Sequence, residues 1–245
     1  MRRIVLQSIA GTCPALDLTA PFARRYAESI GAEYIQERLP NAPICDAFAK
    51  LSLDYWCSRA DQTLWIDADV LCLPGAPDIF ANVPEDRIAA FAHEGDLHQA
   101  ERIPWPLFKL SGYGAGYCNT GVMVWPKHAA GLVRDALEIV RSGGLKKIDK
   151  SRHFYEQTAL NIAFERSGIN VQCLDYRFNA YLADAEITDR WAGDISLHPV
   201  ADAWFVHFAG GAHTPQGYPT VAGNRHSQTE RAEWMEQWMK AKGLI

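Results

Sequence analysis

Two aspartates stand two residues apart at the end of an apolar run. Residues 64–66 read Leu-Trp-Ile, and Asp67, Ala68 and Asp69 follow them. An ionised carboxylate is very costly to bury without a partner, so the pair is expected to face a ligand. Carboxylate oxygens suit Mg²⁺ or Mn²⁺, and substrate phosphates often complete the coordination of such ions. The pair therefore predicts a divalent metal site, with a turn or helix-cap role as the alternative.

Three later segments also carry polar side chains in apolar surroundings. They read Tyr-Cys-Asn-Thr-Gly-Val from Tyr117, Glu-Gln-Thr-Ala-Leu-Asn from Glu156, and Phe-Val-His-Phe-Ala-Gly-Gly from Phe205. Taken singly, each has a plain structural explanation. These are a turn asparagine, an acid that favours a helix N-terminus, and a hydrogen-bonded histidine at a strand end.

In this order, the four segments resemble the motif series of GT-A glycosyltransferases. They are most similar to glycosyltransferase family 8, with its glycogenin-like and bacterial galactosyltransferase-like members. The resemblance extends over about residues 45–215. It implies one Rossmann-like α/β domain, with a mostly parallel sheet flanked by helices, that binds a nucleotide sugar through a divalent cation, usually Mn²⁺. It also implies an enzyme that moves a hexose from this donor, with a UDP sugar favoured, to a hydroxyl acceptor of unknown class.

The resemblance assigns roles residue by residue. Asp67, Asp69 and His207 match the family's metal ligands, and an imidazole beside two carboxylates favours Mn²⁺ over Mg²⁺. The residues that it implies for donor binding are Ser8, Ala10, Gly11, Lys50, Asp67, Ala68, Asp69, Gly210 and His213.

The sugar pocket implied by the resemblance consists of Asn119, Glu156 and Gln157, with Gln157 near the anomeric centre. Glu156 stands where the family has an aspartate, so the pocket is expected to differ in shape. His213 replaces a lysine that reaches the donor phosphates, and its own phosphate contact would depend on pH. A solvated helix lysine is the alternative for Lys50.

Retention of anomeric configuration follows from the resemblance, with the donor diphosphate taking the acceptor's proton. An inverting enzyme would instead need a carboxylate base on the opposite face of the sugar. Asp96, Glu101 and Asp184 are acids without another assigned role that could serve.

Two other readings compete. Haloacid-dehalogenase-type phosphatases also carry Asp-x-Asp after an apolar strand, but on their first strand and with a later acidic motif. Here Gly193-Asp194 lacks the second acid, because position 198 is His198. A catalytically silent protein that binds sugar nucleotides is the second alternative.

Alternating strands and helices must position these residues, which predicts an α/β fold with a mostly parallel sheet. Strands are expected at about 3–9, 33–36, 63–66, 87–92, 122–125, 171–174 and 204–208. Helices are expected at about 21–30, 46–55, 128–141, 155–167 and 228–242. Residues 93–117 form a long loop, for which we predict closure over the donor and selection of the acceptor.

The composition of the chain restricts the classes of function that are expected. The chain has 245 residues, 48% hydrophobic and 22% charged, with a net charge of −5, which disfavours a nucleic-acid or anionic-membrane binder. Its six cysteines include no Cys-x-x-Cys pair, so disulfides and a zinc module are not expected. Without a signal-like start or an apolar run of membrane-spanning length, we expect a reduced cytoplasmic protein with no integral membrane segment.

The last expected helix carries an apolar stripe of Trp234, Met235, Trp238 and Met239. Within 228–242 the acidic and basic residues balance, whereas a helix that lies on anionic lipid normally has a cationic face. Packing on the domain or on a second copy of the chain is therefore favoured over membrane docking, and a homo-oligomer is left open.

Overall fold

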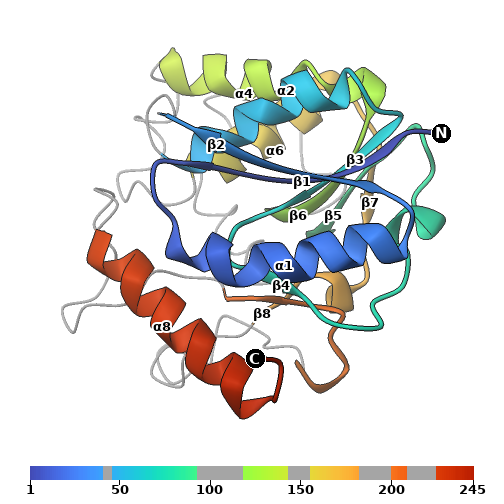
Figure 1. Ribbon diagram of the computed structural model, residues 1–245. Helices are drawn as coiled ribbons and strands as arrows, with labels where there is room; N and C mark the ends of the chain where they lie inside the picture. The colour runs from blue at the N-terminus through green and yellow to red at the C-terminus, as the bar shows by residue number, and fades with distance from the viewer. Residues whose placement is uncertain (41–45, 93–117, 143–154, 182–199, 209–224) are drawn as a thin grey trace, which may run out of the picture.

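A mixed sheet of six strands forms the centre of the molecule (Figure 1). The computed structural model describes residues 1–40, 46–92, 118–142, 155–181, 200–208 and 225–245. The strands are β1 (Arg3–Ala10), β2 (Glu33–Leu39), β3 (Gln62–Ile66), β5 (Ile88–Ala92), β6 (Cys118–Pro126) and β7 (Val171–Cys173). Their order is β2-β1-β3-β6-β5-β7, and only β6 runs antiparallel to its neighbours.

Helices cover both faces of this sheet. Helices α2 (Ser52–Cys57), α4 (Leu132–Arg141) and α6 (Tyr155–Ser167) lie on one face, while α1 (Pro14–Ser29) lies on the other (Figure 1). Short 3-10 turns accompany them at Asp46–Leu51, Ile79–Asn82, Lys127–Ala129, Tyr176–Phe178 and Val200–Asp202.

The strand sequences explain the two covered faces. Along β3, Trp65 packs with the cluster under α4 and α6, whereas Leu64 and Ile66 pack with the cluster under α1. In β6, Met123 alternates with Val122 in the same way. Because successive strand side chains point to opposite faces, a strand with apolar residues at every position must be buried on both sides.

A second, small sheet lies beside the end of the first. It contains β4 (Val70–Cys72), β8 (Ala180–Tyr181) and β9 (Phe205–His207) in the order β4-β9-β8. β9 runs antiparallel to β4 and places His207 opposite Val70. Three segments that are far apart in the sequence thus meet immediately after the Asp-x-Asp turn.

The C-terminal helix α8 (Arg225–Ala241) packs on the body of the domain. Met235 and Met239 are buried against residues of α1 and β9. The rings of Trp234 and Trp238 meet the edge of Phe208 at centroid distances of 5.2 and 5.5 Å. The stripe therefore packs on the protein, as its charge balance favoured. Among the described residues, no helix is long and apolar enough to cross a membrane.

Several element boundaries differ from the sequence prediction. α1 begins at Pro14 instead of residue 21, since a proline at the first helical position is favourable and Pro21 is accommodated inside the helix. The segment expected as one helix from residue 46 is a 3-10 turn that continues into α2. β6 begins at Cys118, so Asn119 lies in a strand, and the turn interpretation of this residue is wrong.

Candidate functional site

The Asp-x-Asp turn is fixed at the carboxyl end of β3. The Asp67 N–H donates to the carbonyl of Gly121 at 2.7 Å, and the Phe208 N–H donates to the carbonyl of Asp69 at 2.9 Å. From α1, the Thr19 hydroxyl donates to the carbonyl of Ala68 at 2.9 Å. Backbone and side-chain contacts from three elements therefore hold the turn that presents both carboxylates.

His207 joins the two aspartates. The metal-ligating atoms of Asp67, Asp69 and His207 all lie within 4.8 Å of one another. His207 Nε2 is 3.5 Å from Asp69 Oδ1. The sequence prediction that these three side chains converge is confirmed. Two carboxylates and one imidazole form a donor set that fits a divalent transition ion such as Mn²⁺.

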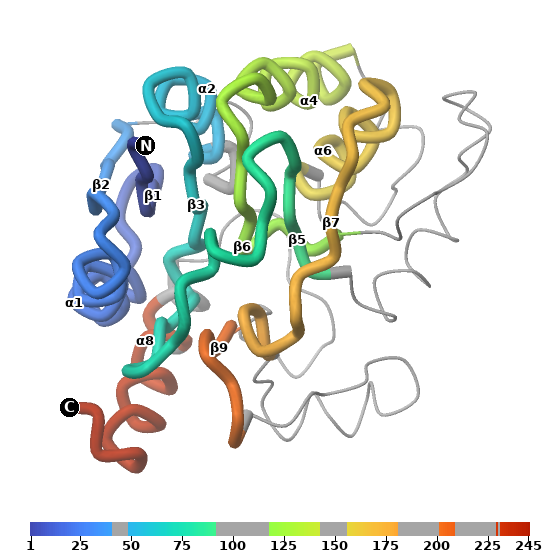
Figure 2. The backbone as a smooth tube through the Cα atoms, turned by 90° about the vertical axis from the view of Figure 1, so that its right-hand side faces the viewer, coloured from blue at the N-terminus to red at the C-terminus, as the bar shows by residue number. Residues whose placement is uncertain are grey.

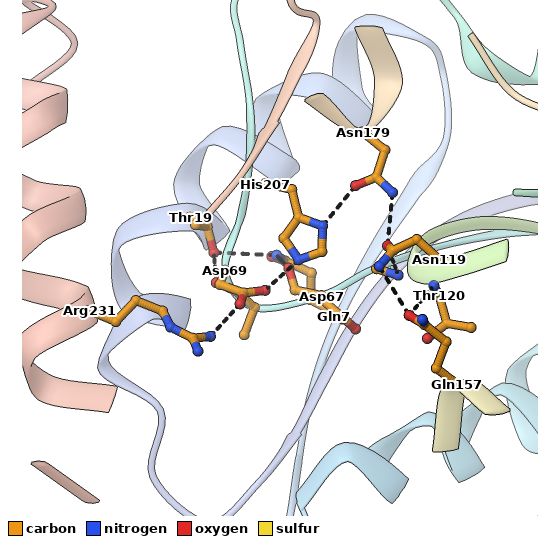
Figure 3. A network of polar contacts seen from close by, with 12 residues as sticks. Gln7, Thr19, Asp67, Asp69, Asn119, Thr120, Gln157, Asn179, His207 and Arg231 are labelled. Atoms are coloured by element: carbon orange, nitrogen blue, oxygen red, sulfur yellow. Dashed lines mark hydrogen bonds and ion pairs between the residues drawn. The ribbon is translucent and has the colours of Figure 1, made fainter. Parts of the chain in front are cut away.

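A buried chain of hydrogen bonds orients the His207 ring (Figure 3). Asn119 Oδ1 accepts from the Gly121 N–H at 2.8 Å and from Asn179 Nδ2 at 2.9 Å. Asn179 therefore presents its Oδ1 to His207 Nδ1, at 2.8 Å, and this oxygen can only accept. Nδ1 must then donate a proton to this hydrogen bond, so Nε2 is the ring nitrogen that faces Asp69 and could bind a metal ion. This is the tautomer that a metal-binding histidine requires.

The chain continues to helix α6 through Gln157. Its Oε1 accepts from Asn119 Nδ2 at 3.0 Å and from the Thr120 N–H at 3.3 Å. Asn161, one turn later, bonds both backbone groups of Cys118 at 2.8 and 2.9 Å and so ties α6 to β6. Gln157 Nε2 has no hydrogen-bond partner among the described residues. A buried amide donor of this kind is suited to an oxygen of a bound ligand.

Gly121 lets the histidine approach the strand. A Cβ atom built at Gly121 would lie 2.4 Å from His207 Cε1 and 3.0 Å from Asn119 Oδ1. Both distances are shorter than ordinary van der Waals contact, so any side chain here would displace the imidazole. The glycine is required by close packing and not by its backbone angles.

Two cations neutralise the aspartates. Lys50 Nζ lies 2.8 Å from Asp67 Oδ1 and 3.7 Å from Glu156 Oε1. Arg231, from α8, forms an ion pair with Asp69 (Figure 3). Lys50 is only 3% exposed, so the alternative of a solvated helix lysine is wrong.

The site also shifts two ionisation equilibria. Burial alone would lower the pKa of the Lys50 ammonium, but Asp67 and Glu156 beside it outweigh burial and raise that pKa. Burial would likewise raise the pKa of Asp69, yet Arg231 and His207 hold it well below its usual range. The aspartate is therefore ionised and paired with Arg231.

An open pocket adjoins these charged groups. It is lined by Ser8, Ile9, Ala10, Cys13, Ala15, Ala49, Lys50, Trp65, Asp67, Ala68, Asp69, Glu156 and Arg231. The Ser8 hydroxyl at its edge is buried and has no hydrogen-bond partner within the described part of the chain. Three carboxylates and two cations give the lining a net charge of −1. The pocket is thus lined by both charged and apolar residues. It lies at the carboxyl end of the sheet, where α/β proteins bind ligands.

Curated proteins similar in sequence transfer sugars. The lipopolysaccharide 1,3-galactosyltransferase of Salmonella typhimurium is 25% identical over 202 residues, which cover 77% of this chain and 56% of that protein. The lipopolysaccharide 1,2-glucosyltransferase of Escherichia coli is 23% identical over 172 residues, covering 69% and 48%. The chain thus spans about half the length of these curated relatives. No family model matches the chain.

Solved structures align over nearly the whole chain. Galactosyltransferase LgtC, in complex with donor and acceptor sugar analogues, matches 99% of this chain and 100% of that chain, with 14% identity and a TM-score of 0.60. A glycosyltransferase involved in glycosylation of the major capsid of PBCV-1 matches 97% and 100%, with 15% identity and a TM-score of 0.59. The chain has the GT-A glycosyltransferase fold. The fold class expected from the motif series is therefore confirmed.

Within this GT-A domain, the structure brings most of the predicted residues together. Ser8, Ala10, Lys50, Ala68 and Glu156 line the pocket beside the two aspartates. Gly11 follows β1 with a left-handed backbone and does not line the pocket, and neither do Asn119 and Gln157. The remaining predictions concern Gly210, His213, Asp96, Glu101, Asp184 and residues 93–117, which lie outside the described residues.

Three residues of the candidate site were not predicted from the sequence. Asn179 carries the hydrogen bond to His207, Arg231 pairs with Asp69, and Trp65 Nε1 donates to Asp67 Oδ1 at 2.6 Å. Trp65 stands in the apolar run before the acids, and its indole N–H could have been suggested as a partner. Asn179 and Arg231 gave no local signal, because only the tertiary fold brings them to the acids.

Proposed function

We propose that this chain is a metal-dependent glycosyltransferase that moves a hexose from a nucleotide sugar to a hydroxyl acceptor. The observation that carries the proposal is the convergence of Asp67, Asp69 and His207 beside a pocket at the carboxyl end of β3. These three residues would hold a divalent cation, with Mn²⁺ preferred, and this ion would neutralise charge on the donor diphosphate. The tautomer that Asn179 imposes on His207 supports such a role.

Donor binding by the residues around the acids is the second part of the proposal. The pocket extends from the metal-binding residues to Ser8 and Ala10 at the end of β1, where the nucleoside would lie. The buried hydroxyl of Ser8 and the buried amide of Gln157 are both polar groups for which a ligand would supply partners. Gln157 and Asn119 would then contact the sugar, and Lys50 would keep Asp67 and Glu156 in place.

Retention of configuration is the proposed stereochemical outcome. An inverting transferase needs a carboxylate that accepts the acceptor's proton. Each carboxylate that lines the described pocket is already paired with a cation, Asp67 and Glu156 with Lys50, and Asp69 with Arg231. A carboxylate that is held by a cation is poorly placed to take a proton from an acceptor hydroxyl. This supports a mechanism in which the departing diphosphate accepts the proton.

The names of the curated relatives suggest which substrates to try first. One relative transfers galactose and the other glucose, and both names specify lipopolysaccharide. We therefore propose UDP-galactose and UDP-glucose as the first donors and a saccharide hydroxyl as the first class of acceptor. The uridine nucleotide is part of the proposal and is tested by replacing it with the GDP and ADP sugars.

The test is nucleoside diphosphate release from each donor, with Mn²⁺, with Mg²⁺ and with a chelator. We expect Mn²⁺-dependent release that an added saccharide acceptor accelerates, and loss of this release in Asp69→Asn. Lys240→Ala, a change on the outer face of α8, is the matched control. Binding of the nucleotide without turnover would favour a silent binding protein. Phosphate release from simple monoesters would favour a phosphatase.

A further inference from the structure

Arg231 occupies a place that the proposed metal site needs. Its guanidinium pairs with Asp69 Oδ2, while His207 Nε2 faces Oδ1 of the same carboxylate at 3.5 Å. The side chain of Asp69 is 14% exposed and that of Arg231 is 22% exposed, so water screens the pair only weakly. Figure 3 shows Arg231 and His207 on opposite sides of this carboxylate. A divalent cation that binds Asp69 must therefore either share this carboxylate with the guanidinium or replace the guanidinium there.

Arg231 also lies on a firmly packed helix, α8. Met235, one turn later on α8, is completely buried, and so is Met239 one turn beyond it. The apolar side of the helix lies against α1 and β9. The helix is thus anchored by packing, and a change of the arginine rotamer would move the guanidinium without moving the helix. The guanidinium can then exchange partners within the pocket that it already lines.

The charge of the pocket lining couples the binding of a divalent cation to the binding of a donor diphosphate. With three carboxylates and two cations, the lining has a net charge of −1 before any ligand binds. A divalent cation and the diphosphate of a nucleotide sugar carry equal and opposite charges, so binding both leaves that balance unchanged. A cation that binds alone leaves Arg231 without its counter-charge on Asp69. A diphosphate that binds alone faces three carboxylates.

We propose that Arg231 is a donor-binding residue that exchanges Asp69 for the donor diphosphate when the divalent cation binds. The planar guanidinium suits this role, because it forms paired hydrogen bonds to phosphate as well as to carboxylate. In the free protein Arg231 competes with the cation for Asp69. In the complex it binds the diphosphate, so each ligand favours the other. This inference rests on the proposed function and adds a residue from α8 to its donor site.

The test measures binding and not turnover. Mn²⁺ affinity is determined by electron paramagnetic resonance with and without UDP, and UDP and uridine affinities are determined by calorimetry. In Arg231→Ala we expect Mn²⁺ alone to bind about fivefold more tightly, because its competitor is gone. We expect UDP in the presence of Mn²⁺ to bind about tenfold more weakly, and uridine to bind as before. By linkage, the enhancement of Mn²⁺ affinity by UDP must shrink by the same factor as the enhancement of UDP affinity by Mn²⁺.

Controls separate this inference from the proposed function. Lys240→Ala removes an exposed cation of the same helix that pairs with Glu236, and it should behave as wild type. Arg231→Gln keeps most of the side chain and serves in place of the alanine variant if that variant melts early. If wild type binds both Mn²⁺ and UDP and the Arg231 variants bind them equally well, the inference about Arg231 is wrong but the proposed function stands. Wild type that binds neither ligand overturns the proposed function as well.

Discussion

Gly121 is the residue at which the site tolerates no side chain. A Cβ atom there would lie 2.4 Å from the His207 ring. We therefore predict that Gly121→Ala displaces the imidazole and weakens Mn²⁺ binding about tenfold or more, the usual scale for disturbing a ligand's support. Gly131→Ala is the matched control, because its Cβ would meet only the mobile end of Arg134 at 3.6 Å. Equal Mn²⁺ affinities in titrations of the two variants would contradict the assigned role of His207.

Asn179 supports His207 from the other side. Asn179→Ala removes the acceptor for His207 Nδ1 and the donor to Asn119. The ring should then lose its fixed tautomer, and Mn²⁺ affinity should fall by about tenfold to a hundredfold. Nitrogen chemical shifts of the imidazole report the tautomer directly. A variant that keeps a protonated Nδ1 and full metal affinity would show that Asn179 is not needed to orient the ring.

At the scale of elements, the small sheet β4-β9-β8 assembles the site. β4 has three residues and β8 has two, which is too short for a periodic sequence signal, whereas β9 lies within the strand expected at 204–208. The motif order predicted that the two aspartates and His207 would meet, but Asn179 could not be predicted because its place depends on the pairing of β8 with β9. Strands with a continuous apolar run were predicted well, such as β3 with its run Leu64-Trp65-Ile66. Helix starts were predicted less well, since Pro14 and Pro21 both suit a first turn.

Helix α8 stabilises the fold by packing and also carries Arg231, which pairs with Asp69. Met235 is completely buried against α1 and β9, so Met235→Ala should leave a cavity and lower the free energy of unfolding by about 2–5 kcal/mol. Lys240→Ala on the outer face should change it by less than about 0.5 kcal/mol. Chemical denaturation of both variants checks the difference. A Met235→Ala variant as stable as wild type would mean that α8 is not docked as described.

At the scale of the whole molecule, the two sheets and α8 meet at one acidic site. The residues of this site come from distant parts of the chain. Figure 2 shows β3, β6, β5 and β7 side by side, with β9 and α8 below them. The Asp-x-Asp turn leaves the large sheet at β3 and enters the small sheet at β4, so Asp67, Asp69 and His207 lie at the junction. The chain shares its fold with glycosyltransferases at 14–15% identity. In this chain, that fold brings two carboxylates and one histidine together.

The position of a bound cation decides whether Asp67, Asp69 and His207 form a metal site. Crystals grown with Mn²⁺ and UDP should be measured at the manganese absorption edge, where anomalous scattering identifies the ion. We predict one strong peak within bonding distance of Asp67, Asp69 and His207, with the diphosphate of UDP bound to the same ion. A peak elsewhere in the molecule, or a diphosphate bound away from these three residues, would contradict it.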